Sequence, residues 1–256
     1  MATLDAVIHF LMIPLVFINL DKDAERRSRL EHELARLQVS GQRLPAIWWK
    51  LLDTKQQQAL YDEALNAQQY YKPLVDGEKG CYASHIAAWR RLLDSDAPAM
   101  VVLEDDVRLD DAFAQVIDAI TAMPHAWDMV KLMGREHEKV RSAVALTPTH
   151  QLIQYRRVPS FTAGYVISRN GAEKLLKSRI PFGRPIDIDL RFWWENDMQI
   201  LGVQPPPVLL DDTSLDTSII GRKPSPSWTV RWRKLCMKWR LTQGNARHLS
   251  TQLPLR

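Results

Sequence analysis

Three consecutive carboxylates, Glu104, Asp105 and Asp106, follow a short apolar run that begins at Ala99. The run is rich in valine and follows Pro98, which favours a buried strand of a parallel sheet over a helix. Three adjacent anions repel one another, and a hard cation such as Mg²⁺ or Mn²⁺, which takes oxygen ligands, would relieve that repulsion. The sequence therefore predicts a strand that ends in a candidate metal and phosphate site. A solvated acidic loop is the competing interpretation.

A second pair of acids, Asp187 and Asp189, lies further along the chain, and Glu195 follows it. On an extended segment, two acids two residues apart face the same way and could share one ligand. Alternatively, they cap the helix that follows them. Trp193 and Trp194 could form a platform for the apolar face of a sugar, although large aromatic side chains more often belong to the core.

Polar residues also stand where other predicted elements begin or end. Asn19 closes an apolar strand at 14–20, and open α/β sheets bind ligands at the carboxyl ends of their strands. A turn residue that bonds its own backbone is the alternative for Asn19. Ser84 and His85 open a helix predicted over 83–93, where a histidine is more often a cap or packing residue than a functional one.

The elements that must position these residues alternate between strands and helices along the chain. Apolar runs predict strands at 14–20, 44–48, 99–106, 128–133, 151–155, 161–168 and 203–210. Helical spacing or polarity predicts helices after residue 21 and at 51–66, 83–93, 110–122 and 170–177, with irregular segments at 68–80 and 135–150. This alternation indicates an α/β fold, with a mostly parallel central sheet covered by helices.

The composition of the 256-residue chain is that of an ordinary globular protein, with 46% hydrophobic and 25% charged residues. Its two cysteines, Cys81 and Cys236, are far apart and lack the spacing of a zinc site. We expect both to be reduced, which fits a cytosolic location.

The charge is distributed unevenly between the body and the C-terminal end. Residues 222–256 contain nine Lys or Arg and no acid, whereas residues 1–221 have a formal charge of about −5. If 227–241 is helical, one face carries Trp228, Trp232, Leu235 and Trp239 and the rest carries cations. Such a helix suits a membrane interface. Alternatively, it docks its tryptophans on the body with its charges outward.

Several segments taken together resemble one family, the bacterial lipopolysaccharide and lipooligosaccharide glycosyltransferases of glycosyltransferase family 25. The resemblance covers roughly residues 14–221, and the order and spacing of its motifs make it specific. The motifs are Phe17-Ile18-Asn19-Leu20 with Arg26-Arg27, Gly80-Cys81-Tyr82-Ala83-Ser84-His85, Val102-Leu103-Glu104-Asp105-Asp106, Thr162 to Ser168 with Gly171-Ala172, and Arg184-Pro185-Ile186-Asp187 with Trp193-Trp194-Glu195.

The resemblance implies a GT-A-like, single Rossmann-type domain at 1–221, followed by the basic tail at 222–256. It implies roles for the matched residues, each at its own position. Asn19, Leu20 and Arg27 would lie at the uridine end of the donor cleft, Ser84, His85, Glu104 and Asp105 would help bind the donor, Asp106 would bind the metal, and Asp187, with Asp189 and Glu195 as rivals, would be the catalytic base.

The activity that the resemblance implies is inverting transfer of a hexose, galactose or glucose, from a UDP-sugar to a lipopolysaccharide, lipooligosaccharide or other glycan acceptor, with Mn²⁺ or Mg²⁺ as cofactor. A carboxylate would take the proton of the acceptor hydroxyl. We expect a cytoplasmic protein, peripheral on the inner face of the bacterial inner membrane, where 222–256 could contact anionic lipid. The alternatives are a catalytically degenerate glycan-binding protein and, less favoured because the body is acidic, a nucleic-acid-associated protein that uses the basic tail.

Overall fold

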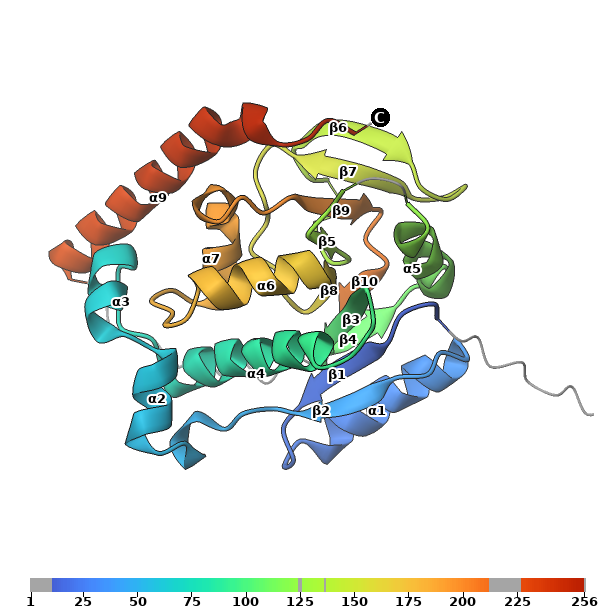
Figure 1. Cartoon of the computed structure of the whole chain (residues 1–256), viewed down its shortest axis with the longest axis horizontal. Helices are drawn as coiled ribbons and strands as arrows, with labels where there is room; N and C mark the ends of the chain where they lie inside the picture. The colour runs from blue at the N-terminus through green and yellow to red at the C-terminus, as the bar shows by residue number, and fades with distance from the viewer. Residues whose placement is uncertain (1–10, 124–125, 136, 212–226, 256) are drawn as a thin grey trace, which may run out of the picture.

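An eight-stranded sheet forms the centre of the protein in a computed structural model, which describes residues 11–123, 126–135, 137–211 and 227–255 (Figure 1). The strands follow the order β2-β1-β3-β8-β5-β9-β7-β6. β8 and β7 run antiparallel to their neighbours, and the other six strands share one direction. The predicted α/β class with a mostly parallel sheet is therefore confirmed. The strands are β1 (Leu15–Asn19), β2 (Gln42–Pro45), β3 (Ala99–Glu104), β5 (Met129–Lys131), β6 (Val140–Ala145), β7 (Gln151–Tyr155), β8 (Gly164–Ser168) and β9 (Ile200–Gln204), with β4 (Val107–Leu109) and β10 (Val208–Leu210) pairing separately.

Helices cover both faces of this sheet. The helices are α1 (Ala24–Arg36), α2 (Thr54–Leu60), α3 (Glu63–Gln69), α4 (Asp76–Leu93), α5 (Phe113–Thr121), α6 (Arg169–Ser178), α7 (Ile186–Asp189) and α9 (Trp228–His248), with 3₁₀ turns η1 (Trp49–Leu51), η2 (Leu190–Glu195) and η3 (Leu249–Thr251). One core joins α1 and α5 to Leu15 and Phe17 of β1, and the other joins α4, α6 and α9 to Val16 and Ile18 of the same strand. Alternate side chains of β1 thus enter opposite cores, which explains why a strand buried on both faces reads as a continuous apolar run.

Most predicted elements are present, with shifts that follow from local chemistry. α4 begins at Asp76, well before the predicted start at 83, because the side chain of Glu78 accepts the backbone N–H of Val75 and caps the helix early. The polar helix predicted at 51–66 is divided into η1, α2 and α3, and Asp53 and Asp62 cap the two α-helices. The segment predicted to be irregular at 135–150 contains β6, an edge strand with alternating exposure.

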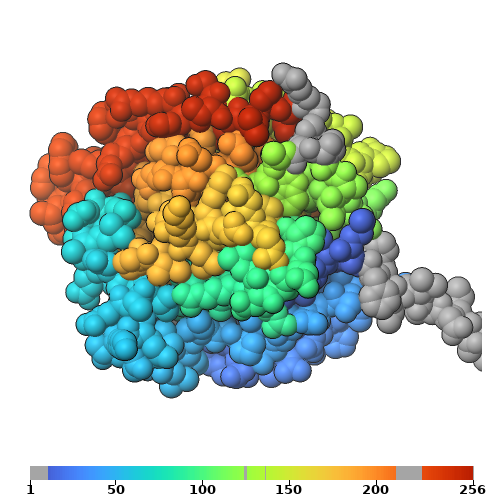
Figure 2. All heavy atoms as spheres, viewed as in Figure 1, coloured from blue at the N-terminus to red at the C-terminus, as the bar shows by residue number. Residues whose placement is uncertain are grey.

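The C-terminal helix α9 lies along the outside of the molecule, at the upper edge of Figure 2. It docks through Met237, Leu241 and Asn245, which are buried, and not through its tryptophans. The Asn245 side-chain oxygen accepts the indole N–H of Trp193 at 3.1 Å. The predicted boundary at 221/222 lies outside the described residues. No helix in the described part of the chain is long and apolar enough to cross a membrane.

Candidate active site

The carboxyl ends of β1, β2 and β3 meet at one edge of the sheet, where they border a pocket of about 340 Å³ that we call the strand-end pocket. Leu20 follows β1, Trp48 follows β2, and Glu104 ends β3, while the first half of α4 forms the opposite wall. The parallel strands therefore bring Asn19 and Glu104, which end β1 and β3, to one edge of the sheet, where open α/β sheets bind ligands.

Asn19 acts within the protein and holds Asp105 in place. Its side-chain amide donates to the Asp105 carboxylate at 2.7 Å, and its oxygen accepts from Arg43 at 2.9 Å. Asn19 is 1% exposed, so it positions the acid without reaching the pocket surface. Arg26 lies 3.4 Å from the other Asp105 oxygen and lines the pocket. Burial raises the pKa of Asp105, and the bonds from Asn19 and Arg26 oppose that rise.

Glu104 faces the His85 imidazole across 3.5 Å and accepts a hydrogen bond from Thr162 at 3.2 Å. Burial acts to raise the pKa of Glu104, but His85 and Thr162 outweigh it and hold that pKa below its ordinary value. His85 is fully buried, and its Nδ1 bonds the Tyr165 hydroxyl at 2.8 Å. Glu104 is therefore a fixed carboxylate at the pocket floor.

Asp106, which follows the pocket residues Glu104 and Asp105 and is not itself among the described lining residues, has unused bonding capacity. Its Oδ1 is buried with no hydrogen-bond partner among the described residues, and its Oδ2 lies 3.9 Å from Arg26. Burial, followed by repulsion from Glu104, raises its pKa to about 6. A divalent cation would satisfy the free oxygen and the repulsion together, so the residues present fit such an ion.

Cys81, His85 and Glu104 also offer ligand atoms within 4.8 Å of one another. Burial and the charge of Glu104 raise the pKa of the Cys81 thiol, which keeps it protonated. A protonated thiol is a poor ligand for a hard cation, so the oxygens of Glu104 and Asp106 are the better donors.

The pocket walls are set by close contacts between α4 and the segment after β2. The Ser84 hydroxyl accepts the backbone N–H of Ile47 at 2.8 Å and donates to the Gly80 carbonyl at 2.7 Å. A Cβ at Gly80 would come within 2.7 Å of the Ile47 carbonyl oxygen, so glycine permits this approach. Ser84 lines the pocket and stabilises its wall.

Sequence reasoning assigned no role to several pocket residues, among them Trp48 and Arg26. Trp48 is 40% exposed, with the Lys22 ammonium 4.5 Å from its ring centre. Arg26 lines the pocket, whereas the neighbouring Arg27, predicted for the uridine end, pairs with Glu31 at 2.8 Å on the exposed side of α1. The sequence contains a signal for each residue. Trp48 stands at the end of the strand predicted at 44–48, and Arg26 is adjacent to Arg27, to which the role was assigned.

A second and larger hollow of about 560 Å³, which we call the basic cleft, opens between loops that follow β5 and β7 and helix α9. Six Lys or Arg and a single acid, Glu138, are among its described lining residues.

Asp187 is half-buried on α7, next to Ile188, which lines the basic cleft, and is itself not among the described lining residues of either cavity. Its charge acts on Cys81 of the pocket and on Tyr70 and Arg191 of the cleft. Burial raises the pKa of Asp187, against the attraction of Lys131 and Arg191. Asp187 is therefore a half-buried carboxylate of increased basicity beside a residue of the basic cleft.

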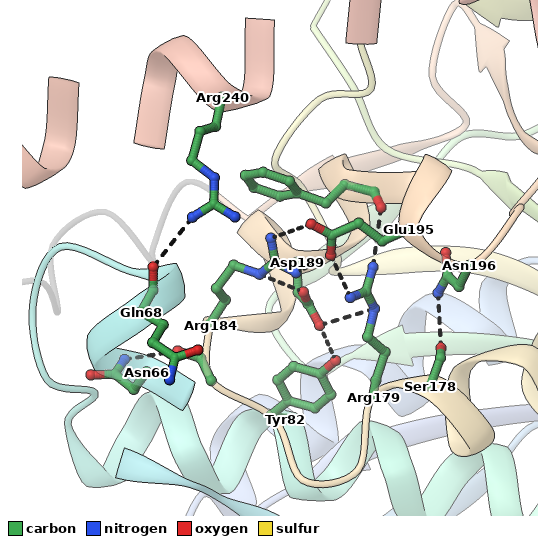
Figure 3. A network of polar contacts seen from close by, with 12 residues as sticks. Asn66, Gln68, Tyr82, Ser178, Arg179, Arg184, Asp189, Glu195, Asn196 and Arg240 are labelled. Atoms are coloured by element: carbon green, nitrogen blue, oxygen red, sulfur yellow. Dashed lines mark hydrogen bonds and ion pairs between the residues drawn. The ribbon is translucent and has the colours of Figure 1, made fainter. Parts of the chain in front are cut away.

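The expectation that Asp187 and Asp189 face the same way is wrong, because α7 is helical and not extended. Residues two apart on a helix point to different sides. Asp189 points inward, where it accepts the Tyr82 hydroxyl at 2.6 Å and pairs with Arg184 at 2.7 Å and Arg179 at 3.5 Å (Figure 3).

Glu195 belongs to the same buried network. It pairs with Arg179 at 2.7 Å and with Arg184, so each guanidinium contacts both acids (Figure 3). These bonds hold the pKa of Glu195 below its ordinary value even though burial acts to raise it. Asp189 and Glu195 thus neutralise two buried arginines, and neither lines the pocket or the cleft among the described residues.

Trp193 and Trp194 do not form an open platform. Trp193 is 1% exposed and bonds Asn245, and Trp194 stacks on His248 with ring centres 6.1 Å apart. Both tryptophans serve as the docking surface for α9.

Comparison with known proteins gives matches over most of the chain. The family "Glycosyltransferase family 25 (LPS biosynthesis protein)" matches residues 12–190. The chain is 30% identical to Procollagen galactosyltransferase 2 of Homo sapiens, over 68% of its own length and 29% of the relative. It is 26% identical to a "Probable inactive glycosyltransferase 25 family member 3" of Bos taurus, over 73% of its own length and 35% of the relative. The chain therefore spans about a third of the length of these relatives or less.

Among solved structures, the chain is similar to a Drosophila β-1,4-galactosyltransferase 7 mutant in complex with manganese, UDP-Gal and xylobiose. The match covers 88% of this chain and 80% of that one, at 9% identity and a TM-score of 0.40. A likeness at this level identifies neither a site nor a substrate.

Proposed function

This chain belongs to glycosyltransferase family 25, and from that premise we propose that it transfers a hexose, galactose or glucose, from a UDP-sugar to a glycan acceptor of lipopolysaccharide or lipooligosaccharide synthesis. The observation that carries the proposal is the strand-end pocket itself, where the acids Glu104 and Asp105 and the cations Lys22, Arg26 and Lys50 border one space at the carboxyl ends of parallel strands. Asp187, which precedes Ile188 of the basic cleft, would lie near an acceptor bound in that cleft.

The donor would occupy the strand-end pocket. The exposed face of Trp48 is suited to stack on the uracil ring, and the cations Lys22, Arg26 and Lys50 border the same space as the acids. These cations would attract the diphosphate.

Glu104 and Asp106 would hold Mn²⁺ or Mg²⁺, with Asp106 as the direct ligand because its Oδ1 is free to bind. When bound, the metal supplies positive charge beside the leaving diphosphate. Asp105, held by Asn19 and Arg26, would stabilise the acidic turn without binding the ion itself.

Asp187 would act as the base. Its carboxylate would accept the proton of the acceptor hydroxyl while that oxygen attacks the anomeric carbon from the side opposite UDP, which inverts the anomeric configuration as the bond to the diphosphate breaks. A raised pKa favours this role, because a more basic carboxylate takes the proton more readily. Asp189 and Glu195 are each bound to two arginines and have no comparable freedom.

The test is release of UDP by the purified chain with Mn²⁺, UDP-galactose or UDP-glucose, and a lipid-linked oligosaccharide. We expect release to depend on the acceptor and the product to have the inverted anomeric configuration by NMR. Binding of UDP and glycan without any acceptor-dependent release would instead favour the degenerate glycan-binding protein.

We also propose that α9 attaches the protein to the cytoplasmic face of the inner membrane. Trp228, Trp232, Leu235 and Trp239 are 59–79% exposed on one side of this helix, which contains no acid. Exposed tryptophans beside cations suit an anionic lipid interface.

Sedimentation with vesicles that contain anionic lipid tests this attachment. We expect Trp232→Gln/Trp239→Gln to lose most vesicle binding, because both side chains are exposed and their removal leaves the docked face of α9 intact. A replacement of the exposed Leu51, far from α9 in sequence, is the control. Equal vesicle binding by the wild type and the double variant would refute attachment through α9.

A further inference from the structure

The basic cleft concentrates positive charge next to Asp187. Its six cations come from separate parts of the chain, namely Arg135, Lys139, Arg157, Arg191, Lys234 and Lys238. Glu138 is the acid among the described lining residues, and its Oε1 already accepts the backbone N–H of Arg135 at 2.9 Å. The local excess of positive charge is unusual because the body of the protein is acidic overall.

Bonds to backbone carbonyl oxygens fix Arg191 and the loop that carries Arg157. Lys131, buried beneath the cleft, donates to the carbonyl oxygens of Pro159, at 3.1 Å, and Phe161, which fixes the loop that carries Arg157. The Arg191 guanidinium donates to the Val158 carbonyl at 3.2 Å. Because these acceptors are neutral carbonyl oxygens, the contacts position the groups without cancelling their charge.

Two observations favour the binding of an anion to these cations. The Nε of Arg157 is buried with no hydrogen-bond partner among the described residues. Burial, followed by repulsion from Arg157, lowers the pKa of Arg191, so the two guanidinium groups lie close enough to oppose each other. Planar guanidinium groups match the geometry of phosphate and carboxylate oxygens.

The same cleft has an aromatic portion suited to a sugar. Tyr71 and Phe161 are half-buried residues of the cleft, and Tyr71 packs against the buried Tyr70 with ring centres 4.3 Å apart. Sugar rings pack their apolar faces on such side chains. The volume of about 560 Å³ is in the range that holds small ligands.

We propose that the basic cleft is an acceptor subsite for a glycan that carries an oxyanion, either a phosphate or a carboxylate, within a residue or two of the attacked hydroxyl. The inference rests on the proposed function, since it assigns the cleft to the acceptor. The anionic group would bind the arginines and lysines, the sugar would pack on the aromatic side chains, and the hydroxyl would reach Asp187. Anionic glycans would then be selected over neutral ones of the same sequence.

The test compares binding of three oligosaccharides by the full chain, measured by isothermal titration calorimetry at two salt concentrations. The three have the same sugars and carry a phosphate, a carboxylate or no charge. We expect an anionic glycan to bind about tenfold more tightly than the neutral one at low salt, because hydrogen bonds to charged groups are the stronger ones. That advantage should shrink as salt is added.

α9 provides a matched pair of variants. Lys234→Gln/Lys238→Gln removes two cleft charges, and Arg231→Gln/Arg247→Gln removes two exposed charges from the same helix outside the cleft. Glutamine preserves helix propensity. We expect the first variant to lose most of the anion preference and the second to retain it, with UDP binding unchanged in both.

Each outcome separates the inference from the proposed function. Equal binding of the three glycans, equal losses in both variants, or tighter binding of an acidic peptide than of any glycan would overturn the subsite. Transfer to neutral acceptors together with any of these results would leave the proposed function standing. Selective anionic-glycan binding without transfer to any acceptor would reject the function and retain the subsite.

Discussion

Asp187 and Asp189 are neighbours with the same side chain, and we expect their replacement by asparagine to have opposite consequences. Asp187→Asn removes a half-buried carboxylate and leaves the ion pairs of Arg179 and Arg184 intact. Asp189→Asn removes a 3%-exposed carboxylate from between Arg184 and Arg179, which are 1% and 8% exposed. The first change should affect transfer and the second should affect stability.

The structure sets the size of the stability effect. Loss of one partner from a buried ion pair typically costs about 3–5 kcal/mol, since a charge remains without compensation. Glu195 still contacts both arginines after Asp189→Asn, so we expect the lower end of that range. A loss of about 3 kcal/mol corresponds to a fall of about 6–12 °C in the melting temperature of a chain of this size.

For Asp187→Asn, loss of a general base predicts a fall in kcat of about 10²–10⁴-fold with nearly normal UDP binding. Urea denaturation, UDP titration and acceptor-dependent UDP release, all measured below the melting temperature of both variants, check these expectations. The assignment would be refuted if Asp189→Asn unfolded like the wild type and lost transfer, or if Asp187→Asn lost UDP binding.

Three further predictions follow from individual side chains. Asp106→Ala should abolish the Mn²⁺-dependent part of UDP binding and leave the metal-free part unchanged; binding that still responds to Mn²⁺ would exclude Asp106 as a ligand. Trp48→Ala should weaken UDP binding by about tenfold, as expected for loss of a stacked base, whereas replacement by Phe should restore most of it; equal affinities by titration would remove the stacking role. Burial lowers the pKa of Lys131 to about 7, so between pH 7 and 8.5 the unfolded chain binds more protons than the folded one, and the free energy of unfolding should rise by up to about 1.4 kcal/mol per pH unit. Urea denaturation across this range should show a smaller slope for Lys131→Met, and identical slopes would mean that the buried amine does not titrate there.

The strand that carries the acids could be predicted because its signal is local. In an α/β protein, a valine-rich run that ends in charged residues is typical of a buried parallel strand. The apolar run that ends at Asn19 gives the same signal for β1. Membership of the family was likewise predictable from spaced motifs and is confirmed by the match over 12–190.

The division of roles between the second pair of acids was not predictable from the sequence, since it depends on which partners lie nearby. Arg179, Arg184 and Tyr82 surround Asp189 only after α4, α6 and α7 have packed together. Similarly, the early start of α4 depends on a single Glu78 cap, and the outward direction of the α9 tryptophans depends on Asn245 meeting Trp193. Such contacts between distant segments leave no periodic signal along the chain.

Once docked, the helix α9 contributes side chains to two different surfaces of the protein. Lys234 and Lys238 border the basic cleft, whereas Trp232 and Trp239 face outward. Arg233 donates a hydrogen bond to the Tyr70 carbonyl oxygen at 2.7 Å, which holds the helix on the body. If lipid binds the outer side of α9 and an acceptor binds the inner side, any displacement of the helix changes both the lipid affinity and the acceptor affinity. Thermodynamic linkage then requires that membrane binding and acceptor binding change each other's affinity by the same factor. Residence on the bilayer and occupancy of the cleft would rise and fall together.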